Sequence, residues 1–206
     1  MALNPARGIA PAKVERKLPQ ILTSKEVELF LEQPDPADAK GCRDKAMLEL
    51  LYATGIRVSE LIHLKVEDMN LAVGFITCRD EHKERMIPFG KVARQAMVNY
   101  MESGRASLLK GQESEWLFTN CSGRPMSRQG FWKIIKYYGE KAGIQADITP
   151  HTLRHSFAAP LLGNGADIHA VQAMMGHSDM ATTQMYMNYT RGEAVRSAYA
   201  GAHPRN

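Results

Sequence analysis

The sequence contains no long hydrophobic run. No window approaches the roughly 18 consecutive apolar residues that a membrane-spanning helix needs. The N-terminal segment MALNPARGIAPAKVERK also lacks the apolar stretch of a secretion signal. We therefore expect a cytoplasmic protein that does not have a membrane as a partner.

Cysteine is also scarce, and the pattern excludes two kinds of site. An odd number of cysteines at wide spacing fits neither a disulfide framework nor a thiolate metal site. No repeat of fixed period and no low-complexity tract is present, so we expect one compact, non-repetitive domain with short extensions. The three cysteines, which we expect to be reduced, are Cys42, Cys78 and Cys121.

Positive charge is in mild excess. The chain has 26 lysines and arginines among 206 residues and a formal net charge of +4. Such an excess suits a polyanionic partner, although many proteins with this charge bind nothing acidic. Composition therefore permits a nucleic acid partner without indicating one.

Apolar spacing predicts helices over most of the chain. Thr23 and Glu26 have the spacing of a capping box at the start of the first helix. A second helix over residues 43–54 is predicted to end at Gly55, and a third follows over residues 58–69. Helical spacing recurs over residues 91–102 and, after Ser127 as N-cap, from Phe131 to Tyr138.

Between these helices the hydrophobic period changes to that of strands. The runs GFITC and RMIPFG are short and β-like, and the charged segment RDEHKE joins them as a predicted hairpin tip. The run WLFT at residues 116–119 is a candidate third strand. The predicted fold class is α+β, mainly α-helical with a small antiparallel β-sheet near residues 74–120.

Most of the polar chemistry lies between residues 148 and 189. Thr149 as N-cap and Pro150 in the first turn predict a helix that runs to about Leu162. On it, His151 and Arg154 can point donors at one anion near the helix N-terminus, where the macrodipole favours negative charge. We expect a basic face and a dry face, the first with His151, Arg154, His155 and Ala158 and the second with Leu153, Phe157 and Leu161.

Three further polar residues stand beside predicted helix ends. His177 directly follows the helix stop at Gly176 and lies nine residues before Tyr186. Arg57 follows the stop at Gly55, and Glu60 opens the next helix, so the Arg57 guanidinium can be held by that turn.

Each of these residues alone also has an ordinary structural interpretation. Pairs of arginine and histidine on a helix surface are usually solvated, and a tyrosine between methionines is usually core or interface. His151 and His155 could ligate zinc, but Thr152 stands where the glutamate of a His-Glu-x-x-His site would be, and no third ligand is evident. We therefore expect no metal.

Four segments occur together in this chain: ATGIRVSEL, HTLRHSFA, GHSD and TTQMYMNY. Their order and wide separation are far more specific than any one segment. Together they resemble the signature boxes of the tyrosine recombinase, or phage integrase, family, in particular its Xer-like branch, from residue 19 to 206. The resemblance implies the catalytic-domain fold of these DNA breaking and rejoining enzymes.

The resemblance also implies roles for individual residues in a site-specific DNA recombinase. Arg57 and Arg154 would bind the scissile phosphate beside His151, His177 would contact the phosphate and leaving group, and Tyr186 would form a 3′-phosphotyrosyl intermediate. Two planar guanidinium groups can bind the charged phosphate oxygens without a metal, so no metal or other cofactor is expected. The covalent intermediate conserves the bond energy, so ATP is not expected either. Free tyrosine has a pKa near ~10, so attack needs a cationic pocket or a base, a role we expect of His151.

The family's hairpin lysine is the weakest part of the match. Relatives carry a Gly-Lys-Gly-x-Lys-x-Arg run there to protonate the leaving 5′ oxygen, whereas this chain has RDEHKER. We assign the role to Lys83, the one lysine in the turn, although it could match the family's second, structural lysine. Arg79 or His82 would then be the substitutes.

The resemblance implies a domain organisation and an assembly. Residues 1–19 would be an interdomain linker remnant, 20–190 the catalytic domain and 191–206 a tail that docks on a neighbouring protomer. The family's N-terminal core-binding domain would be absent. We expect double-stranded DNA as partner, a homotetramer on paired sites, a monomer without DNA, and association with the nucleoid.

Two other functions remain open at this point. Residues 166–188 also fit a noncatalytic helix-turn-helix module, which would leave Arg57, His151 and Arg154 unexplained. A type IB topoisomerase would share the tyrosine chemistry but would relax supercoils without exchanging strands.

Overall fold

Side-chain caps define where several helices begin in the computed structural model, which describes residues 20–80 and 83–202. Thr23 and Glu26 form the expected capping box. The Ser127 hydroxyl accepts from the amide of Gly130 at 3.0 Å. Thr149 caps a helix that has proline in its first turn, as predicted.

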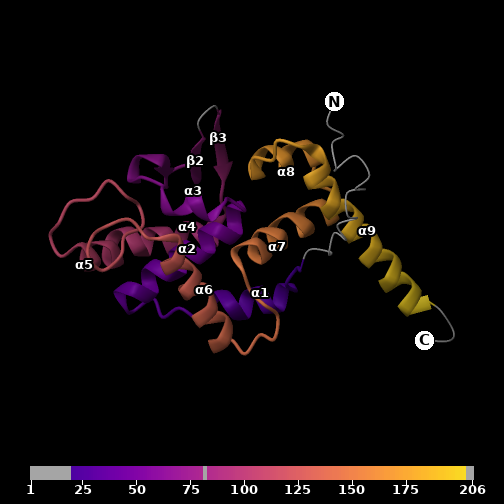
Figure 1. Cartoon of the computed structure of the whole chain (residues 1–206), viewed down its shortest axis with the longest axis horizontal. Helices are drawn as coiled ribbons and strands as arrows, with labels where there is room; N and C mark the ends of the chain where they lie inside the picture. Colours follow the sequence, from indigo (N-terminus) through magenta and orange to yellow (C-terminus); the bar gives the residue numbers. More distant parts are fainter. Residues whose placement is uncertain (1–19, 81–82, 203–206) are drawn as a thin grey trace, which may run out of the picture.

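The elements form a mainly helical array with one small sheet, which confirms the predicted fold class (Figure 1). The strands are β1 (Met69–Asn70), β2 (Phe75–Asp80) and β3 (Lys83–Pro88). The helices are α1 (Ser24–Leu31), α2 (Ala39–Thr54), α3 (Val58–Ile62), the 3-10 turn η1 (Val66–Asp68), α4 (Lys91–Asn99), the π-helical segment η2 (Tyr100–Gly104), α5 (Arg105–Leu109), α6 (Arg128–Lys141), α7 (Pro150–Gly163), α8 (Ile168–Met175) and α9 (Met180–Ala202).

The sheet is antiparallel in the order β1-β2-β3, and the hairpin lies where the sequence predicted it. Phe75 pairs with Pro88 at one end of the hairpin and Asp80 with Lys83 at the other. The third strand is β1, so the prediction of a strand at residues 116–119 is wrong. That segment makes only isolated bridges, from Trp116 to Lys65 and from Thr119 to Pro125.

The predicted helix over residues 58–69 was too long for a related reason. The structure ends α3 at Ile62 and continues through η1 into β1. The amide of Leu117 donates to the carbonyl of Leu64 at 2.8 Å, and the amide of Val66 donates to the carbonyl of Glu115 at 2.9 Å. These long-range bonds hold residues 64–66 extended, so tertiary pairing overrides the local helical spacing.

Helix α2 runs through the middle of the main core. Its residues Met47, Leu48, Leu50 and Leu51 are fully buried although they point in different directions around the helix. A helix that is buried on several sides needs partners on several sides, and α2 packs against α1, α3, α4, α5 and α7. Everything else in the main core is therefore positioned relative to α2.

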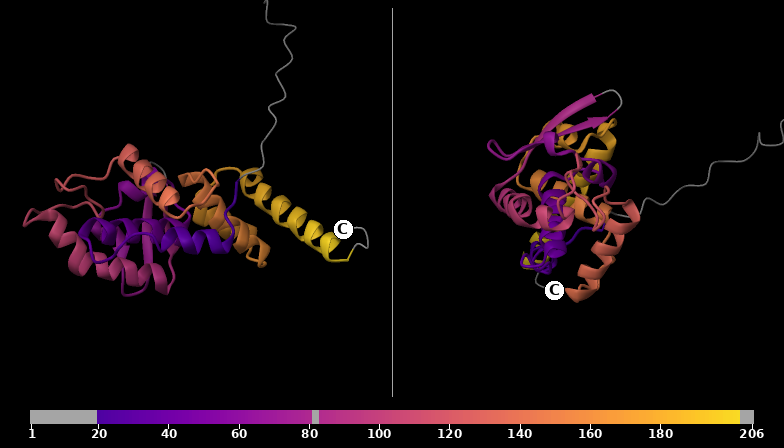
Figure 2. Two further views of the ribbon diagram at one scale, coloured as in Figure 1. Left: turned by 90° about the horizontal axis from the view of Figure 1, so that it is seen from below. Right: turned by 90° about the vertical axis from the view of Figure 1, so that its left-hand side faces the viewer.

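A second, smaller core connects the last three helices. Its buried members are Ala158 and Leu162 of α7, Val171 and Met175 of α8, and Tyr186 of α9. Helix α7 touches α2 on one side and α8 and α9 on the other, so it lies between the main body and the C-terminal helices (Figure 1). The last turns of α9 project away from the rest of the chain (Figure 2).

Part of the predicted domain organisation lies outside the residues that the structure describes. The linker expected over residues 1–19 and the end of the tail at residues 203–206 lie outside them. Within the described part of the chain, no helix is both long and apolar enough to cross a bilayer.

Gly55, which ends α2 with a φ of 60°, offers a test of how tightly α2 and α7 meet. A Cβ at this position would lie 2.2 Å from Cδ1 of Phe157 on α7. We expect Gly55→Ala to lower the free energy of unfolding by about 2–4 kcal/mol, since it adds a clash to left-handed strain. Denaturant unfolding measures the loss.

Gly111→Ala is the matched control. Gly111 also has a positive φ, of 84°, but nothing lies within 4 Å of the position that an added methyl group would take. It should lose only about 1–2 kcal/mol from backbone strain. Equal losses for the two variants would mean that the contact with Phe157 does not constrain α2 and α7.

Candidate active site

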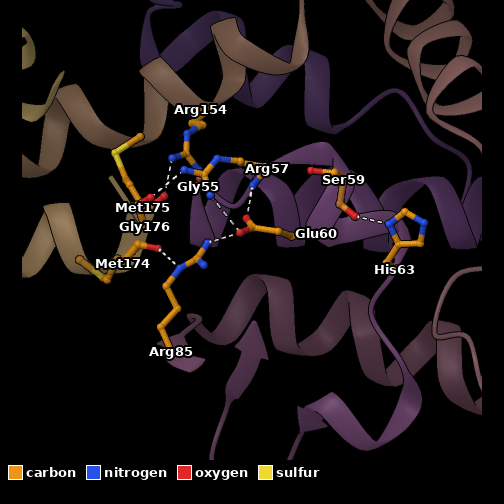
Figure 3. A network of polar contacts seen from close by, with 10 residues as sticks. All are labelled: Gly55, Arg57, Ser59, Glu60, His63, Arg85, Arg154, Met174, Met175 and Gly176. Carbon is orange, nitrogen blue, oxygen red and sulfur yellow. Dashed lines mark hydrogen bonds and ion pairs between the residues drawn. The ribbon is translucent and has the colours of Figure 1, made fainter. Parts of the chain in front are cut away.

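Arg154 is buried and bridges two helix ends. Only 6% of the residue is exposed, and its guanidinium donates to the carbonyls of Gly55 and Met175, the C-cap of α2 and the last residue of α8 (Figure 3). The face of α7 that the sequence predicted to be basic is therefore buried at Arg154, and it is also buried at Ala158. Carbonyls at helix C-termini carry partial negative charge, which explains how a cation is stable there.

The protonation state of Arg154 follows from this position. Burial, with the positive charge of Arg57 nearby, lowers the pKa of Arg154 to about 10. The group therefore remains a cation at neutral pH. Two of its five N–H donors meet the carbonyls of Gly55 and Met175, which leaves donors for another acceptor.

Arg57 is held by the turn that follows it, as the sequence predicted. Its backbone amide donates to the Glu60 carboxylate at 2.7 Å, and its guanidinium meets the same carboxylate at 3.2 Å. Another guanidinium nitrogen donates to the carbonyl of Gly176 at 2.6 Å, just after α8. Because 42% of the Arg57 side chain is exposed, this cation is available to an outside ligand.

Arg85 completes the network together with Glu60, and no role for Arg85 was predicted from the sequence. Arg85 donates to the Met174 carbonyl at 3.0 Å and to Glu60 at 2.7 Å. Three guanidinium groups therefore converge on consecutive carbonyls at the end of α8, and one carboxylate joins two of them (Figure 3). The signal for Arg85 was its place in β3, two residues before the buried Ile87 and hence on the inward face.

Tyr186 lies in the second core beside this network. It is 1% exposed, its hydroxyl is 2.7 Å from Nδ1 of His155, and its ring stacks on His177 at 6.4 Å between centroids. Burial raises the pKa of Tyr186, while the charge of Arg154 lowers it. The hydroxyl is therefore protonated at neutral pH and is not open to solvent.

His177 is fixed at the α8–α9 junction. Its Nδ1 is 2.9 Å from the hydroxyl of Thr183, and its amide donates to the carbonyl of Gln172 at 3.2 Å. Burial, together with the charges of Arg154 and Arg57, lowers the pKa of His177 to about 4. Its imidazole is thus neutral at pH 7.

His151 lies on the first turn of α7 and is exposed. Its ring is 6.4 Å from that of His155, one turn further along the helix. His151 and Arg154 line a hollow together with Arg128 and Trp132. A neighbouring hollow of about 670 Å³ is lined by Arg57, His63, Lys65 and Arg79, among others.

The structure thus brings together five of the six predicted site residues. Arg57, Arg154 and His177 surround the end of α8, Tyr186 stacks on His177, and His151 joins them through His155. The side chain of Lys83 and all of His82 lie outside the described residues. Arg79 is 53% exposed at its side chain and pairs with Asp68 and Glu84.

Comparison with known proteins decides which family this arrangement belongs to. The model of the phage integrase family matches residues 20–193. The chain is 49% identical over 203 residues to tyrosine recombinase XerD of Halalkalibacterium halodurans, covering 98% of this chain and 68% of the relative. It is 48% identical over 205 residues to XerD of Staphylococcus aureus, covering 99% and 69%. The chain belongs to the phage integrase family and is a tyrosine recombinase.

Solved structures agree with the fold of this recombinase. The crystal structure of XerA recombinase superposes with a TM-score of 0.74 at 30% identity, covering 92% of this chain and 68% of that one. XerH site-specific recombinase, bound to palindromic difH substrate in a post-cleavage complex, has a TM-score of 0.76 at 25% identity and coverages of 89% and 53%. These relatives do not favour the helix-turn-helix or topoisomerase alternatives. Among the described residues, no group of three histidine, cysteine or acidic side chains could hold a metal ion.

The Arg85 network generates a stability prediction for the recombinase. Arg85 is 16% exposed at its side chain and Glu60 11%. Arg85→Ala would remove one charged donor from the Glu60 carboxylate, which keeps Arg57, and would remove the Arg85 donor from the Met174 carbonyl. We expect the free energy of unfolding to fall by about 2–3 kcal/mol, as for loss of a charge-assisted hydrogen bond. Denaturant unfolding gives the value.

Lys65→Ala is the control for Arg85→Ala. It breaks an ion pair with Glu115 in which the two side chains are 38% and 59% exposed. Exposed pairs are screened by water and contribute little to stability, so the loss should be clearly smaller than that of Arg85→Ala. If the free energy of unfolding falls equally in the two variants, the bonds of Arg85 to Glu60 and to the end of α8 do not stabilise the fold.

Proposed function

We propose that this recombinase binds double-stranded DNA and cleaves and rejoins its strands through a 3′-phosphotyrosyl intermediate on Tyr186. The main support is the convergence of Arg57, Arg154 and His177 around the end of α8, with Tyr186 stacked on His177. The relative XerH, with substrate bound in a post-cleavage complex, supports the same chemistry.

Arg57 and Arg154 are the proposed phosphate ligands. Both are cations, and each uses only some of its donors within the protein. The carbonyls and the Glu60 carboxylate hold the two guanidinium groups in place before substrate arrives. Donors fixed in advance stabilise charge on phosphate oxygens without the cost of reorganising them.

The two histidines of the family motif would act beside these arginines. His151, exposed on the first turn of α7, can donate to the phosphate at a helix N-terminus. His177 holds the ring of Tyr186 by stacking and would contact the phosphate and the leaving group.

The reaction balances without an added energy source. The Tyr186 hydroxyl gives its proton to a neighbouring base as its oxygen forms a bond to phosphorus. The bond from phosphorus to the 5′ oxygen breaks, and that oxygen takes a proton from a separate donor. We propose Lys83, at the start of β3, as the donor of this proton. Because the phosphotyrosyl bond conserves the energy of the phosphodiester, a 5′-hydroxyl of a second strand can reverse the step without ATP.

The assembly we propose is a homotetramer on paired recombination sites that forms from monomers on DNA. Residues 20–190 would be the catalytic domain, and 191–206 the tail that docks on the next protomer. The support for docking is that α9 continues without a break to Ala202 and extends away from the other helices (Figure 2). Such a protein would act in the cytoplasm at the nucleoid.

Tyr186→Phe tests the proposed chemistry. The variant keeps the buried ring and loses only the hydroxyl, so DNA binding should be unchanged while SDS-resistant adduct with nicked suicide duplexes is abolished. Duplexes with randomised flanks supply the unknown target, and denaturing gels score the adduct.

Tyr137→Phe is the matched control, because Tyr137 is 59% exposed on α6. It should form adduct at the wild-type level. Unchanged adduct in Tyr186→Phe would exclude Tyr186 as the nucleophile and contradict the proposed function.

A further inference from the structure

His155 has no role in the proposed chemistry so far, yet it is the side chain that meets the reacting oxygen. Its Nδ1 is 2.7 Å from the Tyr186 hydroxyl, and the two ring centroids are 5.4 Å apart. That separation is within the range over which a general base takes a proton. The contact links α7, which carries Arg154, directly to α9, which carries the nucleophile.

The other two histidines of the site are placed differently. His177 stacks on the Tyr186 ring with planes 15° apart, and its Nδ1 is engaged by Thr183. Its ring face, rather than a ring nitrogen, thus meets the tyrosine. His151 is exposed and stands beyond His155, at 6.4 Å between ring centroids. The sequence led us to expect His151 as the base. The geometry instead favours His155.

The charge state of His155 also suits an acceptor. Burial, with the nearby His151 and Arg154, lowers the pKa of His155 to about 4, so its imidazole is neutral at neutral pH. With its hydrogen on Nε2, Nδ1 can accept from the tyrosine hydroxyl. A phosphate bound at Arg154 would offset the positive charge around His155 and raise its pKa, so the acceptor becomes more basic when substrate arrives.

We propose that His155 orients the Tyr186 hydroxyl and accepts its proton as the bond from the tyrosine oxygen to phosphorus forms. The bond from phosphorus to the 5′ oxygen breaks in the same step, and a separate donor protonates that oxygen. On rejoining, His155 returns its proton to Tyr186. This inference rests on the proposed function, in which Tyr186 is the nucleophile.

The test compares single-turnover rates of adduct formation on the same randomised suicide duplexes. His155→Ala should form adduct about 100-fold more slowly than the wild type, a typical loss for a general base, with DNA binding unchanged. Free imidazole should restore part of the rate to His155→Ala and none to Tyr186→Phe. A purely structural role for His155 would not respond to imidazole.

His155→Asn separates proton transfer from hydrogen bonding. The asparagine oxygen can accept a hydrogen bond near the place of Nδ1 but does not take a proton at neutral pH. We expect this variant to remain slow, and it carries the comparison if His155→Ala does not fold. His169→Ala, which removes an exposed histidine on α8, should keep the wild-type rate.

Two results would overturn the inference. Adduct formation by His155→Ala at or above the wild-type rate would mean that His155 does not assist attack and instead holds Tyr186 back. Full activity of His155→Asn would mean that His155 contributes only a hydrogen bond to Tyr186 and does not accept its proton. Either result leaves the proposed function intact as long as Tyr186→Phe forms no adduct.

Discussion

The bonds from Arg154 to the ends of α2 and α8 are the interaction on which the rest of the site depends. A buried guanidinium is costly unless polar groups surround it, and here the carbonyls of Gly55 and Met175 do so. The two carbonyls lie in parts of the chain far apart in sequence, so one side chain fixes the relative position of the main body and the C-terminal helices. Burial also gives Arg154 a single, predetermined direction in which its remaining donors point.

Arg57 and Arg85 extend this arrangement at the same helix end. Their bonds to Gly176 and Met174 tie α3 and β3 to α8, and Glu60 balances part of the added positive charge. The residue after Gly176 is His177, so the anchored helix end also sets the position of the ring on which Tyr186 stacks. Packing of Tyr186 among Ala158, Leu162 and Val171 completes the alignment.

Local signals in the sequence predicted much of the fold. The caps at Thr23, Ser127 and Thr149, the stop at Gly55 and the β2–β3 hairpin all depend on nearby residues, and the structure confirms them. The third strand and the length of α3 were predicted wrongly, because backbone pairing between residues 64–66 and 115–117 decides both. Spacing within one segment holds no information about such long-range partners.

The same distinction applies to the site. Through its family resemblance, the sequence predicted Arg57, His151, Arg154, His177 and Tyr186 as site residues. It did not predict the partners of Arg154, because helical periodicity contains no information about carbonyls from other helices. The sequence predicted that the turn at Glu60 holds Arg57, but it did not predict the contact of Glu60 with Arg85 or that of His155 with Tyr186. The contact of His155 with Tyr186 spans 31 positions in the chain, and that of Arg85 with Met174 spans 89.

Hydrogen exchange in Arg154→Lys tests the central role of Arg154 most directly. A lysine cannot place two forked donors on both carbonyls, so the account predicts faster exchange at both helix ends, at the amides of Gly55 and Gly176. Loss of a hydrogen bond from a charged group corresponds to at least a roughly tenfold increase. Amides in the middle of α2, such as that of Leu50, should change less than either helix end. Acceleration at only one end, or at neither, would contradict the claim that Arg154 holds the two together.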